Sequence, residues 1–465
     1  MTDNAPYFFC GVGGSGMLPL ALILRGQGLT VEGSDRSHDQ GRTPEKFDFL
    51  RAQGVRLFPQ DGSGVTRADQ RVVISAAVEE TVPDVQAARR VGASLVKRAE
   101  LLADLFNAAP RAIAVGGTSG KSTTTGMIGW ILTEAGLDPT IMNGAVMKNF
   151  VRADALFASA RVGKGDIFVS EVDESDGSIA LYRPRIAVLN NLALDHKSLN
   201  ELRTLFSDFI GKGETVVLNL DNADVAALAP SAPGKRLTYS LDNPAANFLA
   251  AHIMPQPDGI LFEVRERDGD VVDVRLRTPG RHNVSNALAA IAAARAIGVP
   301  LSQAVESLKR FSGIRRRLEF VGSRGGVTVF DDFAHNPDKI EATLKTLHDF
   351  PGRLLIMFQP HGFGPLKHMK DALIDCFARN LAVEDVLLMP EPVYFGGTVD
   401  RSVGSAEIVS GIAAAGRTAL ALPDRAACGE ELLKLAKPGD RIIIMGARDD
   451  TLSQFAADIL ARVAG

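Results

Sequence analysis

Short apolar runs alternate with longer amphipathic stretches along most of this chain. Each run is bounded by glycine or polar residues and has the length of a strand, and the stretches between runs carry apolar residues at helical spacing. Strands that alternate with helices predict an α/β fold with parallel sheets, in which ligands bind at the carboxyl ends of the strands. The expected strands are 7–10, 29–31, 71–75, 113–115, 166–170, 186–189, 215–218, 327–330, 353–358, 385–389 and 441–445.

The pattern changes between about residues 235 and 280, where apolar and polar residues alternate and turn residues are frequent. This change predicts an antiparallel appendage. The stretch Gly280-Arg-His-Asn-Val-Ser-Asn286 then opens an alanine-rich helix.

The length of the chain predicts several domains. A chain of 465 residues is too long for one core and indicates about three domains. We expect a Rossmann-like domain at 1–107, a central P-loop ATPase-like domain with a parallel sheet at 108–313, and a second Rossmann-like domain at 314–465. The proline-containing stretch Ala108-Ala-Pro110 is the first candidate boundary.

Composition narrows the class of protein. The chain is 46% hydrophobic and 23% charged with a net charge of -4, which is typical of a globular protein and gives no basic surface for nucleic acid. No apolar stretch approaches the roughly 18 residues of a membrane helix, and the first residues lack a basic signal-peptide start. We therefore expect a cytoplasmic protein without a membrane partner. Three distant cysteines, Cys10, Cys376 and Cys428, lack the spacing of a zinc cluster and are expected to be buried.

Residues 111–125, Arg-Ala-Ile-Ala-Val-Gly-Gly-Thr-Ser-Gly-Lys-Ser-Thr-Thr-Thr, predict a phosphate-binding loop. Glycines allow backbone N–H groups to surround a polyphosphate, the following helix adds its positive end, and Lys121 would reach the outer phosphates. Ser122 would then bind Mg²⁺. The usual motif has one more residue before its Gly-Lys pair, so its outer glycine is absent here. The alternative is an ordinary strand-to-helix turn, which needs neither the lysine nor the hydroxyls.

A second glycine loop, Gly11-Val-Gly-Gly-Ser-Gly16, lies between a predicted strand and a predicted helix. Asp35 follows Gly13 at about the 20-residue distance expected for a ribose contact in a nucleotide-binding βαβ unit. From these residues alone, the loop could hold NAD, hold another diphosphate, or be a close-packed turn without a ligand.

Polar residues follow two strands of the central domain. Glu171-Val-Asp-Glu-Ser-Asp176 follows one strand, and Asn190-Asn-Leu-Ala-Leu-Asp-His196 follows the next. Carboxylates and an imidazole near Ser122 are groups that a bound Mg²⁺ or a transferring phosphoryl group would recruit. The alternative for the acidic stretch is a solvated loop.

Together, these stretches resemble one family, the Mur ligases, which build the peptide stem of bacterial cell-wall precursors. The resemblance covers essentially the whole chain. Its motifs lie, in family order, at 11–17 with 33–35, 98–100, 117–125, 171–176, 195–196, 280–288, 313–319 and 331–337. Stretches 171–176, 11–16 and 359–361 look most like members that attach L-alanine to UDP-N-acetylmuramate. Members that attach a recycled murein tripeptide share the first two.

The resemblance implies a bacterial ligase that uses ATP and Mg²⁺. ATP would phosphorylate the carboxylate of UDP-N-acetylmuramate, and the amine of an amino acid or short peptide would attack the acyl phosphate. Free carboxylate and amine do not condense appreciably in water, so ATP supplies the leaving group and the protein supplies positioning and charge neutralisation. The first loop would hold the UDP diphosphate, which makes NAD a minor alternative. We expect a monomer or a weak homodimer.

The resemblance also implies roles for individual residues. The expected ATP-binding residues in the central domain are Gly117, Thr118, Gly120, Lys121, Ser122, Thr123, His282, Asn283 and Asn286. From the third domain, Arg317 would reach the phosphates and Asp332 the ribose. The expected metal ligands are Ser122, Glu171 and His196, and the expected catalytic residues are Lys121, Glu171, His196 and Arg317. The UDP-sugar is expected at Gly13, Gly14, Gly16, Asp35 and Ser75, and the amine substrate at His335, His361 and Arg448.

The chain departs from the family pattern at four places. Members of this branch usually carry His where Ser119 stands, Thr where Ser122 stands, His where Asn336 stands, and Arg-Tyr-Thr-Arg where this chain has Gly362-Phe-Gly-Pro-Leu-Lys367. The last change leaves the amine open between L-alanine, the tripeptide and another amine. A paralogue that binds UDP-sugar and ATP without ligating them, and an NAD-dependent enzyme, are the remaining alternatives.

Overall fold

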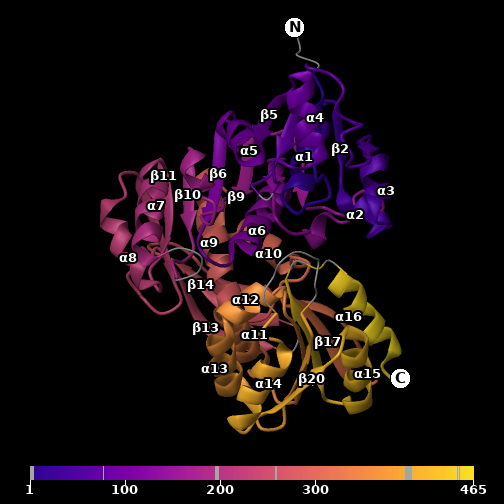
Figure 1. Cartoon of the computed structure of the whole chain (residues 1–465). Coiled ribbons are helices and arrows are strands. Elements are labelled where there is room, and N and C mark those ends of the chain that lie inside the picture. The colour runs from indigo at the N-terminus through magenta and orange to yellow at the C-terminus, as the bar shows by residue number, and fades with distance from the viewer. Residues whose placement is uncertain are drawn as a thin grey trace. The chain divides into compact units, whose positions relative to one another are not determined.

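The computed structural model describes residues 5–76, 78–193, 198–256, 259–392, 401–447, 449 and 451–464. These residues form two compact units (Figure 1). The first contains 1–254, 260–277 and 282–314, and the second contains 255–259, 278–281 and 315–465.

The first unit begins with a five-stranded parallel sheet in the order β3-β2-β1-β4-β5. Its strands are β1 (Tyr7–Cys10), β2 (Val31–Ser34), β3 (Arg56–Phe58), β4 (Arg71–Ile74) and β5 (Ser94–Lys97). Its helices are α1 (Met17–Gly26), α2 (Arg36–Asp39), α3 (Pro44–Ala52), α4 (Pro83–Val91) and α5 (Arg98–Asn107). The predicted Rossmann-like arrangement is confirmed. Strands β3 and β5 were not expected, because they lie at the sheet edges and their half-exposed residues form no apolar run.

A ten-stranded sheet follows in the order β15-β14-β13-β12-β11-β10-β6-β9-β7-β8. Its strands are β6 (Arg111–Gly116), β7 (Thr140–Met142), β8 (Ala160–Arg161), β9 (Ile167–Glu171), β10 (Ile186–Leu189), β11 (Thr215–Asn219), β12 (Lys235–Ser240), β13 (Phe248–Gln256), β14 (Gly259–Glu266) and β15 (Val271–Leu276). Its helices are α6 (Lys121–Glu134), α7 (Leu199–Gly211), α8 (Ala223–Leu228), α9 (Arg281–Ile297) and α10 (Leu301–Lys309), with short 3-10 helices at Lys148–Phe150, Ser178–Leu181 and Ala229–Ser231.

The stretch expected to be an antiparallel appendage is continuous with this sheet. Strand β12 pairs in parallel with β11, and β13 pairs in parallel with β12, whereas β14 and β15 pair antiparallel. The expectation was therefore wrong for β12 and β13. Apolar and polar positions alternate here because these strands are exposed on one face, and such alternation does not determine strand direction.

The two faces of the central sheet are buried against different helices. Ile113 and Val115 of β6 pack with residues of α6, α9 and α10, whereas Ala112 and Ala114 face the opposite core. That second core also contains Leu20 of α1 and Phe106 of α5, beside Phe206 of α7. Burial of α1 and α5 against the central sheet positions the Gly11–Gly16 loop relative to the phosphate loop.

The second unit contains a six-stranded sheet in the order β16-β17-β21-β18-β19-β20. Its strands are β16 (Glu319–Arg324), β17 (Val327–Asp332), β18 (Leu354–Gln359), β19 (Val386–Pro390), β20 (Thr418–Leu422) and β21 (Arg441–Gly446). Its helices are α11 (Pro337–Leu347), α12 (Phe363–His368), α13 (Lys370–Asn380), α14 (Ser405–Ala414), α15 (Arg425–Leu435) and α16 (Thr451–Arg462).

Helices α11, α13 and α14 cover one face of this sheet, and α15 and α16 cover the other (Figure 1). Strand β18 shows why both faces are buried. Leu354, Ile356 and Phe358 pack toward the first group of helices, whereas Leu355 and Met357 pack toward the second. An uninterrupted apolar strand between two helical layers is the doubly wound arrangement that the sequence predicted. In the described part of this sheet, the edge strand β16 pairs antiparallel with β17, and the other strand pairs are parallel.

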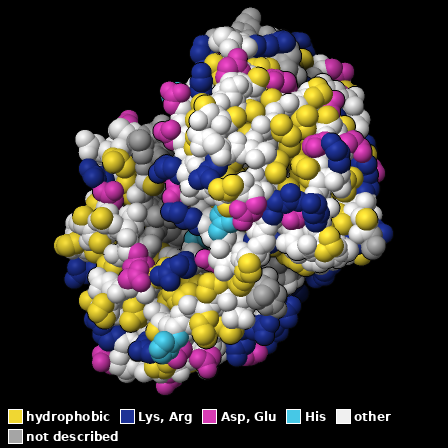
Figure 2. All heavy atoms as spheres, turned by 90° about the horizontal axis from the view of Figure 1, so that it is seen from below, with side chains coloured by type: hydrophobic (Ala, Val, Ile, Leu, Met, Phe, Trp, Pro, Cys, Tyr) yellow, Lys and Arg dark blue, Asp and Glu magenta, His cyan; other side chains and the backbone are white. Residues whose placement is uncertain are grey.

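The described surface agrees with the small net charge. Figure 2 shows basic and acidic side chains mixed over one face of the molecule. Within the described ranges, no helix combines the length and the apolar character needed to cross a membrane.

Candidate functional site

The phosphate loop predicted at 116–120 connects the carboxyl end of β6 to the first residue of α6. Gly117 has φ +132° and Gly120 has φ +79°, values in the region that favours glycine. A Cβ on Gly120 would also lie 2.4 Å from Oδ1 of Asn286. The backbone conformation therefore requires glycine at both positions, and the close approach of α9 requires it again at Gly120.

Lys121 lies at the helix end of this loop, where the sequence placed it. Its Nζ donates to the carbonyl oxygen of Gly117 and to Oε2 of Glu174, each at 2.7 Å. The side chain of Lys121 is 19% exposed and that of Glu174 only 6%. The sequence singled out Glu174 only as part of the acidic stretch 171–176. Because it pairs with Lys121, we include it in the candidate site.

Ser122 and Glu171, the two expected Mg²⁺ ligands that the structure describes, lie together. The Ser122 hydroxyl donates to Oε2 of Glu171 at 2.7 Å. A Cβ on Gly144 would lie 2.1 Å from the other carboxylate oxygen, Oε1, so glycine is needed for Glu171 to occupy this place. The third expected ligand, His196, lies outside the described residues.

Asn191 holds the outer part of the phosphate loop. Its Oδ1 accepts from the Thr118 hydroxyl and from the Ser119 N–H, each at 2.9 Å, and its Nδ2 donates to Oγ of Ser119 at 2.9 Å. Thr118 and Thr123 are buried. The sequence carried a signal for Asn191, since it is the second residue of the polar stretch after β10, but it did not indicate these contacts.

Asp35 organises the other glycine loop. Its Oδ2 accepts from the Gly13 N–H at 2.9 Å, and its Oδ1 accepts from the Ser37 N–H at 2.8 Å, which caps α2. The carboxylate is 9% exposed. The structure therefore gives Asp35 a role in shaping the loop, and the expected ribose contact stays a prediction.

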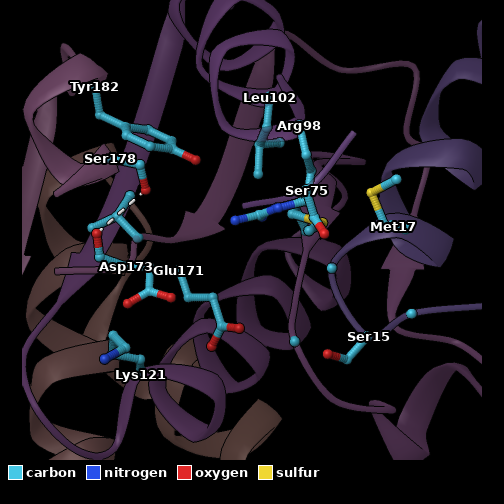
Figure 3. Close-up of a pocket in the computed structure, with 15 residues that line it drawn as sticks. Ser15, Met17, Ser75, Arg98, Leu102, Lys121, Glu171, Asp173, Ser178 and Tyr182 are labelled. Atoms are coloured by element: carbon cyan, nitrogen blue, oxygen red, sulfur yellow. Dashed lines mark hydrogen bonds between the residues drawn. The ribbon is translucent and has the colours of Figure 1, made fainter. Parts of the chain in front are cut away.

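A pocket of about 390 Å³ is lined by Gly14, Ser15 and Gly16 of the first glycine loop and by Lys121, which directly follows the phosphate loop (Figure 3). Gly14, Gly16 and Ser75 come from the Rossmann-like part, whereas Lys121 and Glu171 come from the central part. The pocket thus brings residues predicted for two different ligands to one place.

Arg98 is a pocket residue to which sequence reasoning assigned no role. Figure 3 shows its side chain extending between Ser75 and the Asp173 side of the pocket. Its guanidinium lies against Gly16: a Cβ added to Gly16 would be 3.2 Å from one of its terminal nitrogens. The other terminal nitrogen lies 3.6 Å from Oδ2 of Asp176. The available signal was the stretch Arg98-Ala-Glu100, noted only as part of the family pattern.

The surroundings of two ionisable side chains in the pocket shift their pKa values. Burial raises the pKa of Asp173, but the hydrogen bonds from Ser175 and the charges of Lys121 and Arg98 outweigh it and leave that pKa lowered. Burial raises the pKa of Tyr182. The pocket therefore presents an ionised carboxylate and a neutral phenol beside two cations.

The residues expected at the adenine side lie at the start of α9. Asn283 and Asn286 are buried, 4% and 7% exposed, whereas His282 is exposed. Nδ2 of Asn286 donates to Oδ1 of Asn283 at 3.2 Å. The two amides therefore form one group next to Gly120, and the expected role of His282 stays a prediction.

The expected residues of the second unit lie around one aromatic ring. The Arg317 guanidinium lies 4.5 Å from the ring centre of Phe333. The Asp332 carboxylate accepts from the Leu318 N–H at 3.0 Å and from the Thr343 hydroxyl. Asp332 thus holds the turn beside Arg317, and its predicted ribose contact is untested. Arg448 lies outside the described residues.

Arg316, next to the predicted Arg317, has a structural role. It is 5% exposed and donates to the carbonyl oxygens of Gly446 at 2.6 Å and Asp449 at 2.9 Å. Burial raises the pKa of the neighbouring Asp331 to about 6, although Arg316 acts in the opposite direction. Sequence alone could not separate these two adjacent arginines.

The imidazole rings of His335 and His361, both expected near the amine substrate, lie 5.3 Å apart and nearly perpendicular. Nδ1 of His335 lies 2.9 Å from the carbonyl oxygen of Phe333. The altered stretch after His361 forms α12, with Gly362 at φ +139° before it. Asn336, where the family resemblance led us to expect histidine, caps α11 by accepting from the Lys339 N–H.

His335 predicts an acid-sensitive contribution to stability. Burial, with the nearby charge of Lys339, lowers its pKa to about 3 from 6.5. Below pH 6.5 the unfolded chain therefore binds a proton that the folded protein excludes, so stability falls as pH falls. Between about pH 7.5 and about pH 5, urea unfolding should show about 2 kcal/mol more loss for the wild type than for His335→Asn. Equal acid sensitivity of the two proteins would contradict this expectation.

Comparison with known proteins relates this chain to one family of ligases. Three family models match, described as the Mur ligase family catalytic domain at 6–109, the Mur ligase middle domain at 115–294, and the Mur ligase glutamate ligase domain at 316–448. A UDP-N-acetylmuramate–L-alanine ligase of Synechococcus sp. strain JA-2-3B'a(2-13) is 37% identical over 97% of this chain and 93% of its own length.

Two solved structures share the fold over almost their whole length. The UDP-N-acetylmuramate–alanine ligase of Thermotoga maritima has a TM-score of 0.79 at 24% identity and covers 98% of each chain. A murein peptide ligase of Psychrobacter arcticus has a TM-score of 0.71 at 26% identity and covers 99% of this chain and 100% of its own.

Proposed function

This chain belongs to the Mur ligase family, and we propose that it joins the carboxylate of UDP-N-acetylmuramate to the amine of L-alanine with consumption of ATP. The product would serve peptidoglycan precursor synthesis. The observation that carries this proposal is the single pocket lined by Gly14, Gly16, Lys121 and Glu171. A loop suited to the UDP diphosphate and a loop suited to the phosphates of ATP border the same space, where a muramyl carboxylate and a γ-phosphate can meet.

The proposed reaction has two steps. A carboxylate oxygen attacks the γ-phosphorus of ATP, and ADP leaves, which forms an acyl phosphate. The amine of alanine then attacks the acyl carbon, loses a proton, and expels phosphate to form the amide. Lys121 supports both the binding of the phosphates and the neutralisation of charge during transfer, and it exchanges its contact with Glu174 for phosphate oxygens as ATP binds.

Ser122 and Glu171 fit a Mg²⁺ site. The Ser122 hydroxyl and the Glu171 carboxylate, 2.7 Å apart, are hard oxygen ligands. Because Gly144 has no side chain, it leaves room for the other oxygen of the Glu171 carboxylate. A bound Mg²⁺ would neutralise part of the negative charge on the phosphate oxygens. We propose His196 as the ligand of a second Mg²⁺ near the acyl phosphate. The fold's own contribution is to hold Ser122 at the first turn of α6 and Glu171 at the end of β9.

The remaining assignments are proposals of the same kind. We propose domains at 1–107, 108–313 and 314–465; the second boundary falls between the matched segments 115–294 and 316–448, and the first lies two residues before the end of the segment matched at 6–109. We propose that His282, Asn283 and Asn286 contact adenine and that Arg317 and Asp332 contact ATP. We also propose that His335, His361 and Arg448 orient the amine. We also propose a cytoplasmic enzyme that is a monomer or weak homodimer.

The amine substrate separates this proposal from its main competitor. The similarity to a murein peptide ligase favours the alternative that a recycled L-alanyl-γ-D-glutamyl-diaminopimelate tripeptide is attached. Phosphate release from ATP should be measured with UDP-N-acetylmuramate and either L-alanine or the tripeptide in separate reactions. Release with alanine alone would support the proposal, and release with the tripeptide alone would replace it. Silence with both, despite ATP binding, would indicate either another amine or a non-ligating paralogue.

Arg98 is expected to bind the UDP-sugar. Its guanidinium packs on Gly16 and lines the pocket, so it can reach an anionic group of that substrate. A hydrogen bond to a charged group contributes about 1.5 to 3 kcal/mol, so Arg98→Met should raise the KM for UDP-N-acetylmuramate about 10-fold to 100-fold. The KM for ATP should change less than about threefold. Arg98→Lys, which retains the charge, is the matched control, and equal losses for both substrates would contradict the assignment.

A further inference from the structure

A continuous chain of buried polar side chains lies beneath the phosphate loop. Asn190, which follows β10, is 2% exposed, and its Nδ2 donates to Oγ1 of Thr124 at 2.9 Å. Thr124 is fully buried in α6 and its hydroxyl donates to Oδ1 of Asn286 at 3.2 Å. Nδ2 of Asn286 in turn donates to Asn283. In this series from Asn190 to Asn283, each hydrogen bond is donated by the earlier residue to the next one.

The direction of donation in this series is set by the hydrogen bond between Tyr239 and Asn190. The Tyr239 hydroxyl donates to Oδ1 of Asn190 at 3.4 Å, and burial raises the pKa of Tyr239, so this phenol stays neutral and retains its proton. Asn190 must then present its N–H₂ group to Thr124. The Thr124 oxygen accepts that bond, and its own proton goes to the carbonyl oxygen of Asn286. One hydroxyl thereby determines which way the amide of Asn286 faces.

The same groups touch the phosphate loop. A Cβ on Gly120 would lie 2.4 Å from Oδ1 of Asn286 and 3.0 Å from Nδ2 of Asn190. The chain of side chains therefore joins the turn before Lys121 to the amides at the start of α9. A single shift of Thr124 or Asn190 would affect both.

We propose that Thr124 and Asn190 are positioning residues that fix the amide orientation of Asn286 and thereby select the base of the nucleotide. This inference rests on the proposed function, because it takes Asn283 and Asn286 to face the base of ATP. Adenine and hypoxanthine differ at one edge, where an amino donor is replaced by a carbonyl acceptor. An amide held in one orientation distinguishes donor from acceptor, whereas an amide free to rotate by half a turn accommodates either.

The test compares ATP with inosine triphosphate in the ligase reaction of the full chain. Thr124→Val keeps the shape of the side chain but removes the hydroxyl, and Asn190→Ala removes the first donor. Each variant should lower the ratio of kcat/KM for ATP to that for inosine triphosphate about 10-fold, mainly through the KM for ATP. Thr124→Ser, which restores the hydroxyl, should recover most of the wild-type ratio.

The outcomes separate this inference from a general loss of structure. A merely structural role for the two residues would reduce kcat/KM for both nucleotides alike and leave the ratio unchanged, and this result would overturn the proposal. Failure of Thr124→Ser to recover the ratio would overturn it as well. If one variant does not fold, the other still reports the ratio. A wild-type chain that releases no phosphate from ATP would instead overturn the proposed function.

Discussion

Replacement of Lys121 by alanine should lower ligase turnover by at least about 10³-fold. The loss of one preorganised group that neutralises transition-state charge costs about 10² to 10³ in rate, and Lys121 also contributes to phosphate binding. Phosphate release with saturating UDP-N-acetylmuramate and alanine measures the effect. Near wild-type turnover in this variant would remove the phosphate loop from the mechanism.

The contact with Glu174 adds a control to this experiment. Lys121→Ala leaves Glu174, whose side chain is 6% exposed, without its 2.7 Å partner. A buried charge that has lost its partner is strongly destabilising, so the single variant should also unfold at a lower temperature. Lys121→Ala combined with Glu174→Gln should regain much of the stability but none of the turnover. This double variant separates the loss of chemistry from the loss of folding.

Replacement of Glu171 by glutamine should lower turnover about 10² to 10³-fold and raise the Mg²⁺ concentration needed for half-maximal rate. Glutamine has the size of glutamate and can still accept from the Ser122 hydroxyl, so the fold should be retained. A neutral amide is a weaker ligand than a carboxylate for a hard divalent cation. The measurement is a Mg²⁺ titration of phosphate release.

Ser122→Thr serves as the matched control for this titration. It keeps the hydroxyl at the same position of α6, and its Mg²⁺ dependence should stay close to that of the wild type. Ser122→Ala should shift the Mg²⁺ dependence in the direction of Glu171→Gln. Identical Mg²⁺ curves for wild type and Glu171→Gln would exclude Glu171 as a ligand.

The phosphate loop could be predicted in detail because its determinants are local. Glycines with positive φ, a lysine and hydroxyls are neighbours in sequence, and backbone geometry alone makes them a phosphate site. The proximity of Ser122 and Glu171 was also predictable. Parallel neighbouring strands such as β6 and β9 end at the same edge of a sheet, so residues at their ends meet.

Other parts of the site could not be predicted because they depend on side-chain packing between distant segments. Lys121 contacts Glu174 rather than Asp173, and Asn191 rather than Asn190 clamps the outer loop. Adjacent residues in an irregular segment point in different directions, and no periodic pattern reveals which one faces the site. Arg98 became a candidate only when the pocket placed it against Gly16.

The sequence by itself determined the α/β class, the alternation of the buried strands with helices, the two glycine loops and the family resemblance. These features follow from local hydrophobic periodicity and from backbone requirements that glycine alone satisfies. The tertiary structure decided that β12 and β13 extend the central sheet, that both glycine loops border one pocket, and that Thr124 connects Asn190 to Asn286. The reason is physical: strand partners and hydrogen-bond partners are selected by the burial of whole surfaces, which no local stretch of sequence specifies.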